Sequence, residues 1–337
     1  MASIALSASP APVRSVSAVP AVAVLIPCYN EESTIATVVE DFRAALPDAT
    51  VYVYDNNSSD RTVEKAKAAG AVVRHEPLQG KGNVVRRMFA DIEADVYVMV
   101  DGDDTYHAPS APLLVKRLLD ERLDMVNGAR VTDIVKAYRP GHRFGNKLLT
   151  GLVAGVFGQR INDMLSGYRV FSRRYVKSVP ALAQGFETET ELTVHALELR
   201  MPIAEVKTPY KDRPEGSVSK LNTIRDGIRI LKTIVCLVKE ERPLPFFSAL
   251  FGLLVLAAIL LGGPVILDFM ATGLVPRLPT ALLATGLVLL GFLSLTCGLI
   301  LDTVTLGRRE MKHMRYLAIP APGSAPVSSG PTNRAAV

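Results

Sequence analysis

The sequence has few residues that could cross-link it or bind a soft metal. Among its 337 residues there is no tryptophan, and there are three cysteines, Cys28, Cys236 and Cys297. These cysteines form neither a disulfide framework nor the paired spacing of a zinc site, which favours a reducing compartment. No G-x-G-x-x-G motif follows the first apolar run, and this absence disfavours a dinucleotide-binding dehydrogenase.

The charge balance is basic but not concentrated. The 38 Lys and Arg outnumber the 33 Asp and Glu, for a net charge of +5 and a pI near 9.1. Because the cations are dispersed and belong to no recognition motif, we predict no nucleic-acid partner. A basic protein of this kind fits an anionic lipid leaflet instead. Residues 1–20 lack the basic start and apolar core of a signal peptide, so we expect a disordered leader.

Two long runs near the C-terminus carry no charge at all. Residues 246–267 and 278–301 are each long enough to cross a bilayer, which takes about 20 apolar residues. We therefore predict a two-helix transmembrane hairpin within residues 244–303, followed by a tail over 304–337 that is basic and then disordered. Cations flank the outer ends of the hairpin, whereas its short connection carries only Arg277. By the positive-inside rule, both termini and the large N-terminal part are predicted to be cytoplasmic.

The segment just before the hairpin is amphipathic. Its apolar residues recur at helical spacing, with Arg225, Arg229 and Lys232 mostly off the apolar stripe. We interpret residues 223–243 as a helix lying in the membrane interface and a linker. A core helix of the soluble domain is the alternative. The stripe consists of Ile224, Ile228, Leu231, Val235 and Val238.

Between residues 21 and 222, short β-rich runs alternate with helical patterns. Strands are expected over 21–27, 50–55, 71–76 and within 95–104, with helices between them. This alternation predicts an α/β domain with a mostly parallel sheet and helices on both faces. Ligands of such sheets collect at the carboxyl ends of the strands.

Three carboxylates crowd the end of the fourth predicted strand. Asp101 and Asp103 flank Gly102, so a tight turn allows both carboxylates to converge on one point, and Asp104 follows. Mg²⁺ and Mn²⁺ prefer oxygen ligands, and Mg²⁺ is usually held by one or two carboxylates together with substrate phosphates. We therefore predict a clamp for a metal–diphosphate here, with an ordinary surface turn as the alternative.

Polar residues also follow other strands. Asp55 stands directly at the end of the second strand, where helix capping does not need it. In "PCYNEE", Pro27 stiffens the strand exit, Tyr29 offers a ring face, and Glu31 favours the dipole of the next helix. Lys81 lies between two glycines at a helix start, a setting that suits a phosphate, although the Walker spacing is missing.

Taken together, seven motifs resemble the family-2 glycosyltransferases with the glycosyltransferase-A fold. The nearest branch contains the polyprenyl-phosphate glycosyltransferases, including the dolichyl-phosphate-mannose and -glucose synthases. The resemblance covers roughly residues 21–240 and implies a Rossmann-like catalytic domain; the hairpin is similar to this branch too. The Gln-x-x-Arg-Trp signature of processive polysaccharide synthases is absent. The motifs are "IPCYNEE", "VYDNNSSDRT", "GKGNVVRRM", "DGDDTY", "DMLSGYRVFSRR", "GFETETEL" and "RPEGSVSK".

The resemblance also implies roles for individual residues. Asp101 and Asp103 would bind Mg²⁺ or Mn²⁺ and take part in catalysis. Asp163 is a third catalytic candidate, without an obligatory role as a base. The nucleotide sugar would contact Pro27, Tyr29, Glu31, Asp55, Lys81, Asp101, Arg213 and Lys220. The acceptor phosphate would contact Arg130, Arg143, Ser166 and Arg169.

The implied reaction is an inverting transfer of a hexose from a nucleotide sugar to a polyprenyl phosphate, as part of cell-envelope biosynthesis. UDP-glucose is the favoured donor and GDP-mannose stays open. An undecaprenyl- or decaprenyl-type phosphate is the expected acceptor. A phosphate is already ionised at neutral pH, so it needs positioning more than deprotonation. Two alternatives remain: a membrane-anchored glycan synthase with a sugar hydroxyl as acceptor, and a non-catalytic nucleotide-sugar-binding scaffold. The sugar, the lipid length, the choice of metal and homo-oligomerisation are left open.

Overall fold

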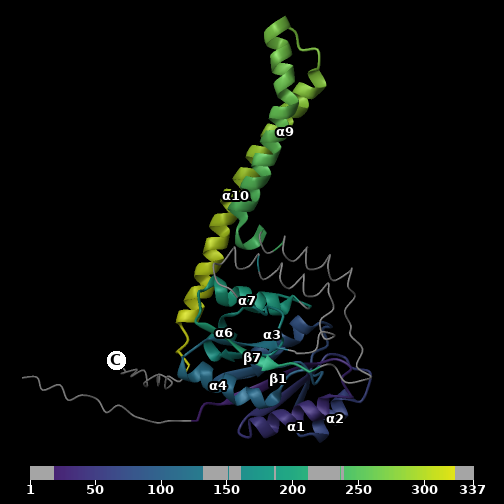
Figure 1. Ribbon diagram of the computed structural model, residues 1–337, viewed down its shortest axis with the longest axis vertical. Coiled ribbons are helices and arrows are strands. Elements are labelled where there is room, and N and C mark those ends of the chain that lie inside the picture. The colour runs from purple at the N-terminus through teal and green to yellow at the C-terminus, as the bar shows by residue number, and fades with distance from the viewer. Residues whose placement is uncertain are drawn as a thin grey trace, which may run out of the picture.

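The computed structural model describes residues 19–131, 151, 161–185, 187–211, 236 and 239–322. An α/β domain occupies the N-terminal part, and a hairpin of two long helices projects from it (Figure 1). Three predicted site residues, Arg143, Arg213 and Lys220, lie outside the described residues. Nearly all of the predicted interfacial helix lies outside them as well.

Strands and helices alternate along the domain as the sequence predicts. Among the described elements, helix α7 and strand β7 precede the hairpin helices α9 and α10. The elements are β1 (Val22–Cys28), α1 (Ile35–Ala45), β2 (Thr50–Asp55), α2 (Thr62–Ala68), β3 (Val72–His75), α3 (Lys81–Asp91), β4 (Val96–Met99), the 3-10 helix η1 (Ala108–Ser110), α4 (Ala111–Asp120), β5 (Met125–Val131), β6 (Arg169–Ser172), α6 (Arg173–Ser178), α7 (Thr188–Glu198), β7 (Ile203–Pro209), α9 (Pro243–Thr272) and α10 (Leu278–Leu317).

The described strands form one sheet in the order β3-β2-β1-β4-β6-β5-β7. Strand β6 runs antiparallel to its neighbours β4 and β5, and the other strands are parallel to one another. This confirms the predicted glycosyltransferase-A-like α/β fold with a mostly parallel sheet. Because β6 runs against β4, the chain enters β6 at the same edge of the sheet where β1, β2 and β4 end. Loops from distant parts of the sequence therefore meet at one edge.

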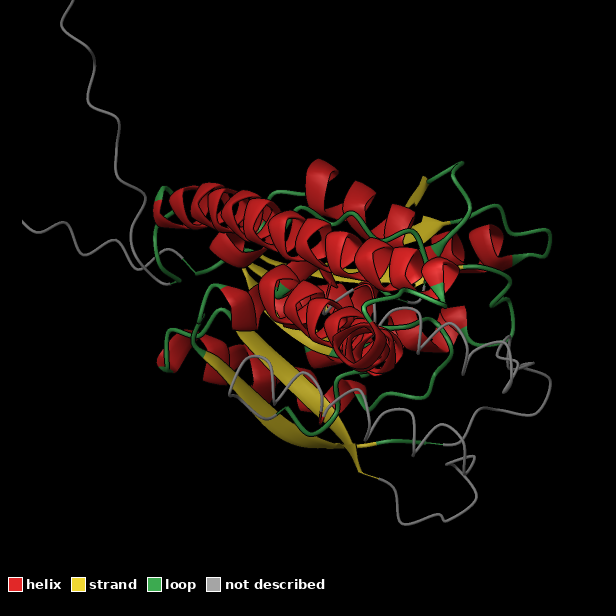
Figure 2. Cartoon of the chain, turned by 90° about the horizontal axis from the view of Figure 1, so that it is seen from above, coloured by secondary structure: helices red, strands yellow, loops and turns green. Residues whose placement is uncertain are grey.

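The sheet has an apolar layer on each face. Figure 2 shows the strands and the helices beside them from above. On one face Leu25 and Tyr97 pack under α3, α6 and α7. On the other face Val24 and Val98 pack under α1, α2 and α4. Successive side chains of a strand point to opposite faces, so the central strands need apolar residues at every position. The continuous "VLI" and "VYVM" runs meet this need, which explains their composition.

The two hairpin helices, α9 and α10, are long and apolar enough to cross a bilayer. A core helix of similar composition would be buried, whereas Leu253, Ile259 and Leu289 are each more than 60% exposed. Two candidate membrane spans thus stand where the sequence predicts them. Helix α10, however, does not end with its apolar run near residue 301 but continues as one helix to Leu317. The basic start of the predicted tail is therefore helical.

Candidate active site

The centre of the site is the Asp101 carboxylate, two residues beyond the end of β4. Its side chain is 28% exposed, and Lys81 donates a hydrogen bond of 2.5 Å to it. The Lys81 ammonium also donates to Glu189 at 2.5 Å, and the Glu189 side chain is only 7% exposed. Burial alone would lower the pKa of Lys81, but the two carboxylates outweigh it and raise that pKa. Lys81 therefore stays charged between two acids that would otherwise repel one another.

Two glycines bring Lys81 to this position. Gly80 has a φ of +131°, a conformation that residues with a side chain rarely adopt. The Gly82 N–H donates to the Gln184 carbonyl at 3.1 Å, and a Cβ on either glycine would overlap the backbone of residues 183 and 184. The Lys81 loop is thus packed against the loop that leads into α7, which explains how Lys81 reaches Glu189 across a long stretch of sequence.

The Asp101 carboxylate lies directly on the backbone of Gly167. A Cβ added to Gly167 would overlap the Asp101 carboxylate, so close contact depends on the missing side chain. The Gly167 N–H donates to the Tyr106 hydroxyl at 2.8 Å. The Tyr106 ring packs in turn on Tyr168 and Tyr210, with ring centroids 5.6 and 5.3 Å apart. These contacts join the "DGDDTY" loop to the "SGYR" segment.

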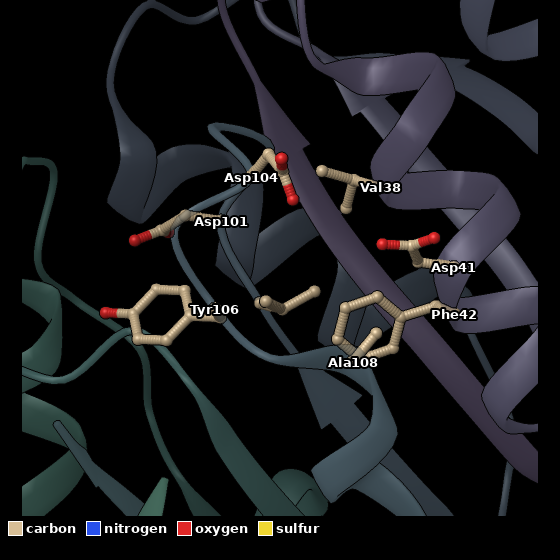
Figure 3. Close-up of a pocket in the computed structure, with 8 residues that line it drawn as sticks. Val38, Asp41, Phe42, Asp101, Asp104, Tyr106 and Ala108 are labelled. Carbon is tan, nitrogen blue, oxygen red and sulfur yellow. The ribbon is translucent and has the colours of Figure 1, made fainter. Parts of the chain in front are cut away.

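The other acids of the "DGDD" turn point elsewhere. Asp103 is buried and accepts a hydrogen bond of 2.6 Å from the Thr105 hydroxyl. Asp104 has a φ of +53° and pairs with Lys211 at 3.2 Å. Figure 3 shows a shallow hollow beside α1 in which the Asp101 carboxylate points away from Asp104 and Asp41. The three acids of the turn therefore have three different surroundings.

We tested whether these acids suit a divalent metal. Within the described part of the chain, no group of three or more His, Cys, Asp or Glu side chains is arranged to hold an ion. The turn instead offers the partly exposed Asp101 and the neighbouring Asp103. One or two carboxylates together with phosphate oxygens are a typical donor set for Mg²⁺ bound with its substrate. The partly exposed Asp101 fits such a metal as it stands, and Asp103 would join it by turning away from Thr105.

A second ion pair lies at the carboxyl end of β5. The Arg130 guanidinium donates to both carboxylate oxygens of Asp163, at 2.7 and 2.8 Å. The backbone N–H of Arg130 donates a third hydrogen bond to the same carboxylate at 3.1 Å. The guanidinium also lies 5.4 Å from the centre of the Tyr210 ring. Burial would raise the pKa of Asp163, but the hydrogen bonds from Arg130 outweigh it and hold that pKa below its ordinary value. Asp163 is thus ionised at neutral pH and orients Arg130.

Ser166 and Arg169 have structural roles in this fold. Arg169 is fully buried and donates to the carbonyls of Ser166 and Met164 and to the Thr193 hydroxyl at 2.8 Å. Ser166 is fully buried as well, and its hydroxyl donates to the Gly128 carbonyl at 2.6 Å. This placement does not support the predicted contact of Ser166 and Arg169 with an acceptor phosphate. We leave both out of the proposed acceptor site.

The residues predicted to bind the nucleoside lie at and after the ends of β1 and β2. Pro27 and Tyr54 are register partners in β1 and β2, so Asp55 stands beside Cys28 at the edge of the sheet. Asp55 is buried; it accepts hydrogen bonds from the Ser58 N–H at 3.3 Å and contacts the His75 ring at 3.2 Å. Asp55 therefore stabilises the turn after β2, a role that the sequence did not predict.

The turns after β1 and β2 are joined to each other. Asn30, with a φ of +52°, accepts from the Ser59 N–H at 2.8 Å, and the Glu31 N–H donates to the Thr62 hydroxyl at 2.8 Å. The Tyr29 ring is 38% exposed next to them. Sequence reasoning missed Asn56, which is buried and accepts from the Gly80 N–H at 2.7 Å, and so connects this region to the Lys81 loop.

Comparison with known proteins identifies the class of this domain. Residues 23–179 match the model of glycosyl transferase family 2. The chain is 58% identical to an uncharacterised protein of Shigella flexneri over 155 residues, which are 46% of this chain and 95% of that one. It is 38% identical over 235 residues to glycosyltransferase AglJ of Haloferax volcanii, covering 68% of this chain and 76% of the relative. The chain belongs to glycosyl transferase family 2.

Two further similarities are more specific. A dolichyl-phosphate hexose transferase of Haloferax volcanii is 30% identical over 220 residues, covering 65% of this chain and 95% of its own. Among solved structures, glucosyl-3-phosphoglycerate synthase from Mycobacterium tuberculosis, in complex with Mn²⁺, UDP-glucose and phosphoglyceric acid, is similar with a TM-score of 0.52 and 25% identity. That similarity covers 64% of this chain and 79% of the synthase.

The contact between Gly167 and Asp101 predicts a sensitive position. In Gly167→Ala the added methyl group would displace the Asp101 carboxylate, and we expect the rate of glycosyl transfer to fall by about a hundredfold, since a shift of ~1 Å can cost that much. The matched control is Gly151→Ala, where a Cβ meets no described atom within 4 Å. Steady-state kinetics on both variants check this, and similar rates would contradict it.

The Lys81 bridge predicts a specific pattern of stability. Lys81→Met would leave Asp101 and Glu189 without their shared cation, and we expect it to lower the free energy of unfolding by about 3 kcal/mol. Adding Glu189→Gln removes one of the two negative charges, so the double variant should recover at least half of the loss. Chemical denaturation of the three proteins measures this. A double variant less stable than Lys81→Met would show that the carboxylates are not the cause.

Proposed function

We propose that this glycosyltransferase moves a hexose from a nucleotide sugar to a polyprenyl phosphate at the cytoplasmic face of a membrane, with inversion at the anomeric carbon. The observation that carries the proposal is that one chain contains both a glycosyltransferase domain and an apolar helical hairpin attached to it. A family-2 catalytic site lies at the sheet edge, and α10 extends from an apolar hairpin to make direct contact with the same domain. A hairpin fixed to its catalytic domain suits an acceptor that is itself held in a bilayer.

The donor is proposed to be UDP-glucose, with GDP-mannose as the other choice. The Mycobacterium tuberculosis synthase, whose fold this chain shares, carries UDP-glucose and Mn²⁺ in its complex. In this chain the nucleoside would lie along Pro27, Tyr29, Glu31 and Asp55. The diphosphate would then lie near Asp101 and Lys81, with Arg213 and Lys220 as further predicted contacts.

Asp101 and Asp103 would hold Mg²⁺ or Mn²⁺. When bound there, the ion would offset negative charge that grows on the departing diphosphate. Lys81 would be a second cation near the diphosphate oxygens, since it already donates to Asp101 at 2.5 Å. Glu189 keeps the ammonium at this position. The chain's own contribution is thus a fixed positive charge beside the leaving group.

The acceptor phosphate is proposed to bind at Arg130, with Arg143 as a further predicted contact. A guanidinium can grip two phosphate oxygens at once. Asp163 holds Arg130 through two hydrogen bonds and leaves the face of the guanidinium against Tyr210. Because Asp163 is ionised and paired, its task is to orient Arg130. The phosphate nucleophile needs no base, so no further acid–base residue is required.

A hydroxyl acceptor is the second candidate. The similar Mycobacterium tuberculosis protein is a glucosyl-3-phosphoglycerate synthase, and its name describes transfer to a small water-soluble molecule. Such an acceptor would not require the hairpin. The lipid acceptor is favoured because a dolichyl-phosphate hexose transferase covers 65% of this chain and because the hairpin is present.

A panel of donors and acceptors tests the proposal. The full chain in vesicles would be supplied with radiolabelled UDP-glucose or GDP-mannose, Mg²⁺ or Mn²⁺, and undecaprenyl phosphate. We expect label in the lipid extract, lost on chelation and in Asp103→Ala by at least a hundredfold, as is typical for the loss of a major electrostatic contribution. Label found only in water-soluble glycosides would favour the hydroxyl acceptor instead. No transfer from any donor would overturn both.

The pH dependence separates the two acceptors. Hydrogen bonds from Arg130 hold the pKa of Asp163 below its ordinary value, so this group stays ionised and paired near neutral pH and does not shape the profile. A phosphate monoester has its second pKa near 6. For a lipid phosphate we therefore expect kcat/KM to rise between about pH 5 and 7 and then to stay level to pH 9. A profile that follows a protein base above pH 7 would point to a hydroxyl acceptor.

A further inference from the structure

The C-terminal end of α10 contacts the α/β domain. We call residues 302–317 of α10 the stalk; at 1.5 Å per residue it is roughly 24 Å long. Figure 1 shows it as the yellow continuation of α10 alongside the α/β domain. The stalk and the catalytic domain are therefore in direct contact and would lie on the same side of a bilayer.

The strongest contact of the stalk is an ion pair with α7. Lys312 donates to Glu198 at 2.6 Å, and Arg309 donates to its other oxygen at 3.4 Å. The Glu198 side chain is only 2% exposed, whereas Arg309 is 34% and Lys312 24% exposed. A buried carboxylate needs a partner charge, and here the partner comes from the stalk.

A second contact lies one helical turn further along the stalk. The Tyr316 hydroxyl donates to Asp124 at 2.8 Å, and the Arg174 guanidinium stacks 4.7 Å from the centre of the Tyr316 ring. Asp124 is fully buried at the start of β5 and also pairs with Arg174 at 2.5 Å. The stalk thus completes a hydrogen-bonded group that belongs to the core of the domain.

The residues that make these contacts share one face of the helix. Thr305, Arg309, Lys312 and Tyr316 are spaced by four, three and four residues, which is the repeat of a single helical stripe. Thr305 is buried and donates to the Glu240 carbonyl at 3.1 Å, next to the start of α9. On the opposite side of the stalk, Glu310 is exposed. The stalk therefore has one orientation relative to the domain.

Helix α7 connects this joint to the active site. Its first turn carries Glu189, which holds Lys81, and its last residue is Glu198, which holds the stalk. The two residues are about 14 Å apart along a rigid helix. In Figure 1, α7 lies on the side of the domain that faces the hairpin. One helix thus contacts both Lys81 and the stalk.

We propose that the stalk is a strut that fixes the height and the orientation of the active site above the lipid surface, with Glu198 as its positioning residue. This inference rests on the proposed function, because height matters only for an acceptor held in a membrane. The contacts at Arg309 and Lys312 lie roughly 12–17 Å beyond the apolar run of α10. A strut of this length holds the site near a phosphate headgroup without inserting it.

The test loosens the strut and leaves the catalytic residues unchanged. Glu241 is close to the same cations and could replace Glu198 as their partner. Its pKa is raised, mainly by burial and also by the nearby charge of Glu198. The loosened variant is therefore Glu198→Gln, Glu241→Gln and Tyr316→Phe together. It leaves Arg309 and Lys312 able to reach water. The matched control is the exposed Glu310→Gln on the same helix.

Each protein would be assayed with undecaprenyl phosphate in vesicles and with a short isoprenyl phosphate in solution. In a separate experiment each would be digested with trypsin, which cleaves after the Arg and Lys residues of the stalk. For the loosened variant we expect faster cleavage in the stalk and a transfer rate to the vesicle acceptor at least about tenfold lower. Its rate with the soluble acceptor and its affinity for the nucleoside diphosphate should stay within about twofold of the unmodified protein.

Other outcomes would overturn the inference. Equal losses with both acceptors would mean that these contacts serve folding alone, and no loss with vesicles would mean that height is set elsewhere. Unchanged trypsin cleavage would show that these contacts do not hold the stalk. If the unmodified protein glycosylated neither acceptor, the proposed function itself would fail, while the cleavage pattern would still report whether the stalk is docked.

Discussion

The structure depends on a single electrostatic requirement at the edge of the sheet: the carboxylate of Asp101 must have a cation beside it. Strands β1, β4 and β6 bring several polar loops to this edge, and the low exposure of the site makes an unpaired charge costly. Lys81 satisfies Asp101 and the buried Glu189 at the same time. The packing of Gly80 and Gly82 against the loop before α7 serves this contact, as does the bare backbone of Gly167 against Asp101.

This requirement also determines which ligand the site can accept. A site that already balances acids against one lysine can accept a metal–diphosphate, because the incoming group carries both the additional cation and the phosphates that Lys81 can bind. The second ion pair, between Arg130 and Asp163, is separate from the first and lies at the end of β5. The two pairs divide the proposed work, one facing the leaving group and the other facing the acceptor. Helix α7 then connects the first pair to the stalk and so to the apolar hairpin.

Much of the fold and part of the site could be predicted from the sequence. The strands and helices follow from local periodicity, and Asp101 was found because it directly follows an apolar strand. The partners were out of reach, because Lys81 meets Glu189 across 108 positions and no local pattern encodes that distance. Arg169 shows the opposite failure: its motif suggested a phosphate ligand, but its burial beside Thr193 depends on packing that only the folded chain reveals.

The same limit applies to the stalk. Arg309 and Lys312 are among the cations that flank the hairpin and predict its orientation, and the structure adds that they pair with a buried acid of α7. A count of flanking cations cannot distinguish a charge that faces lipid headgroups from one that is paired with protein. The spacing of Thr305, Arg309, Lys312 and Tyr316 was the available signal, because it places polar residues on one helical face immediately after an apolar span.

The central claim is that Asp101 gives up its contact with Lys81 only to a metal that comes with a diphosphate. Titration of the full chain with Mn²⁺, followed by electron paramagnetic resonance with and without UDP, tests this most directly. We expect weak binding of Mn²⁺ alone and binding at least about tenfold tighter with UDP, since the described residues offer two carboxylates and no cluster of three ligands, so that phosphate oxygens must complete the site. Equally tight binding without UDP, or no binding with it, would contradict the account.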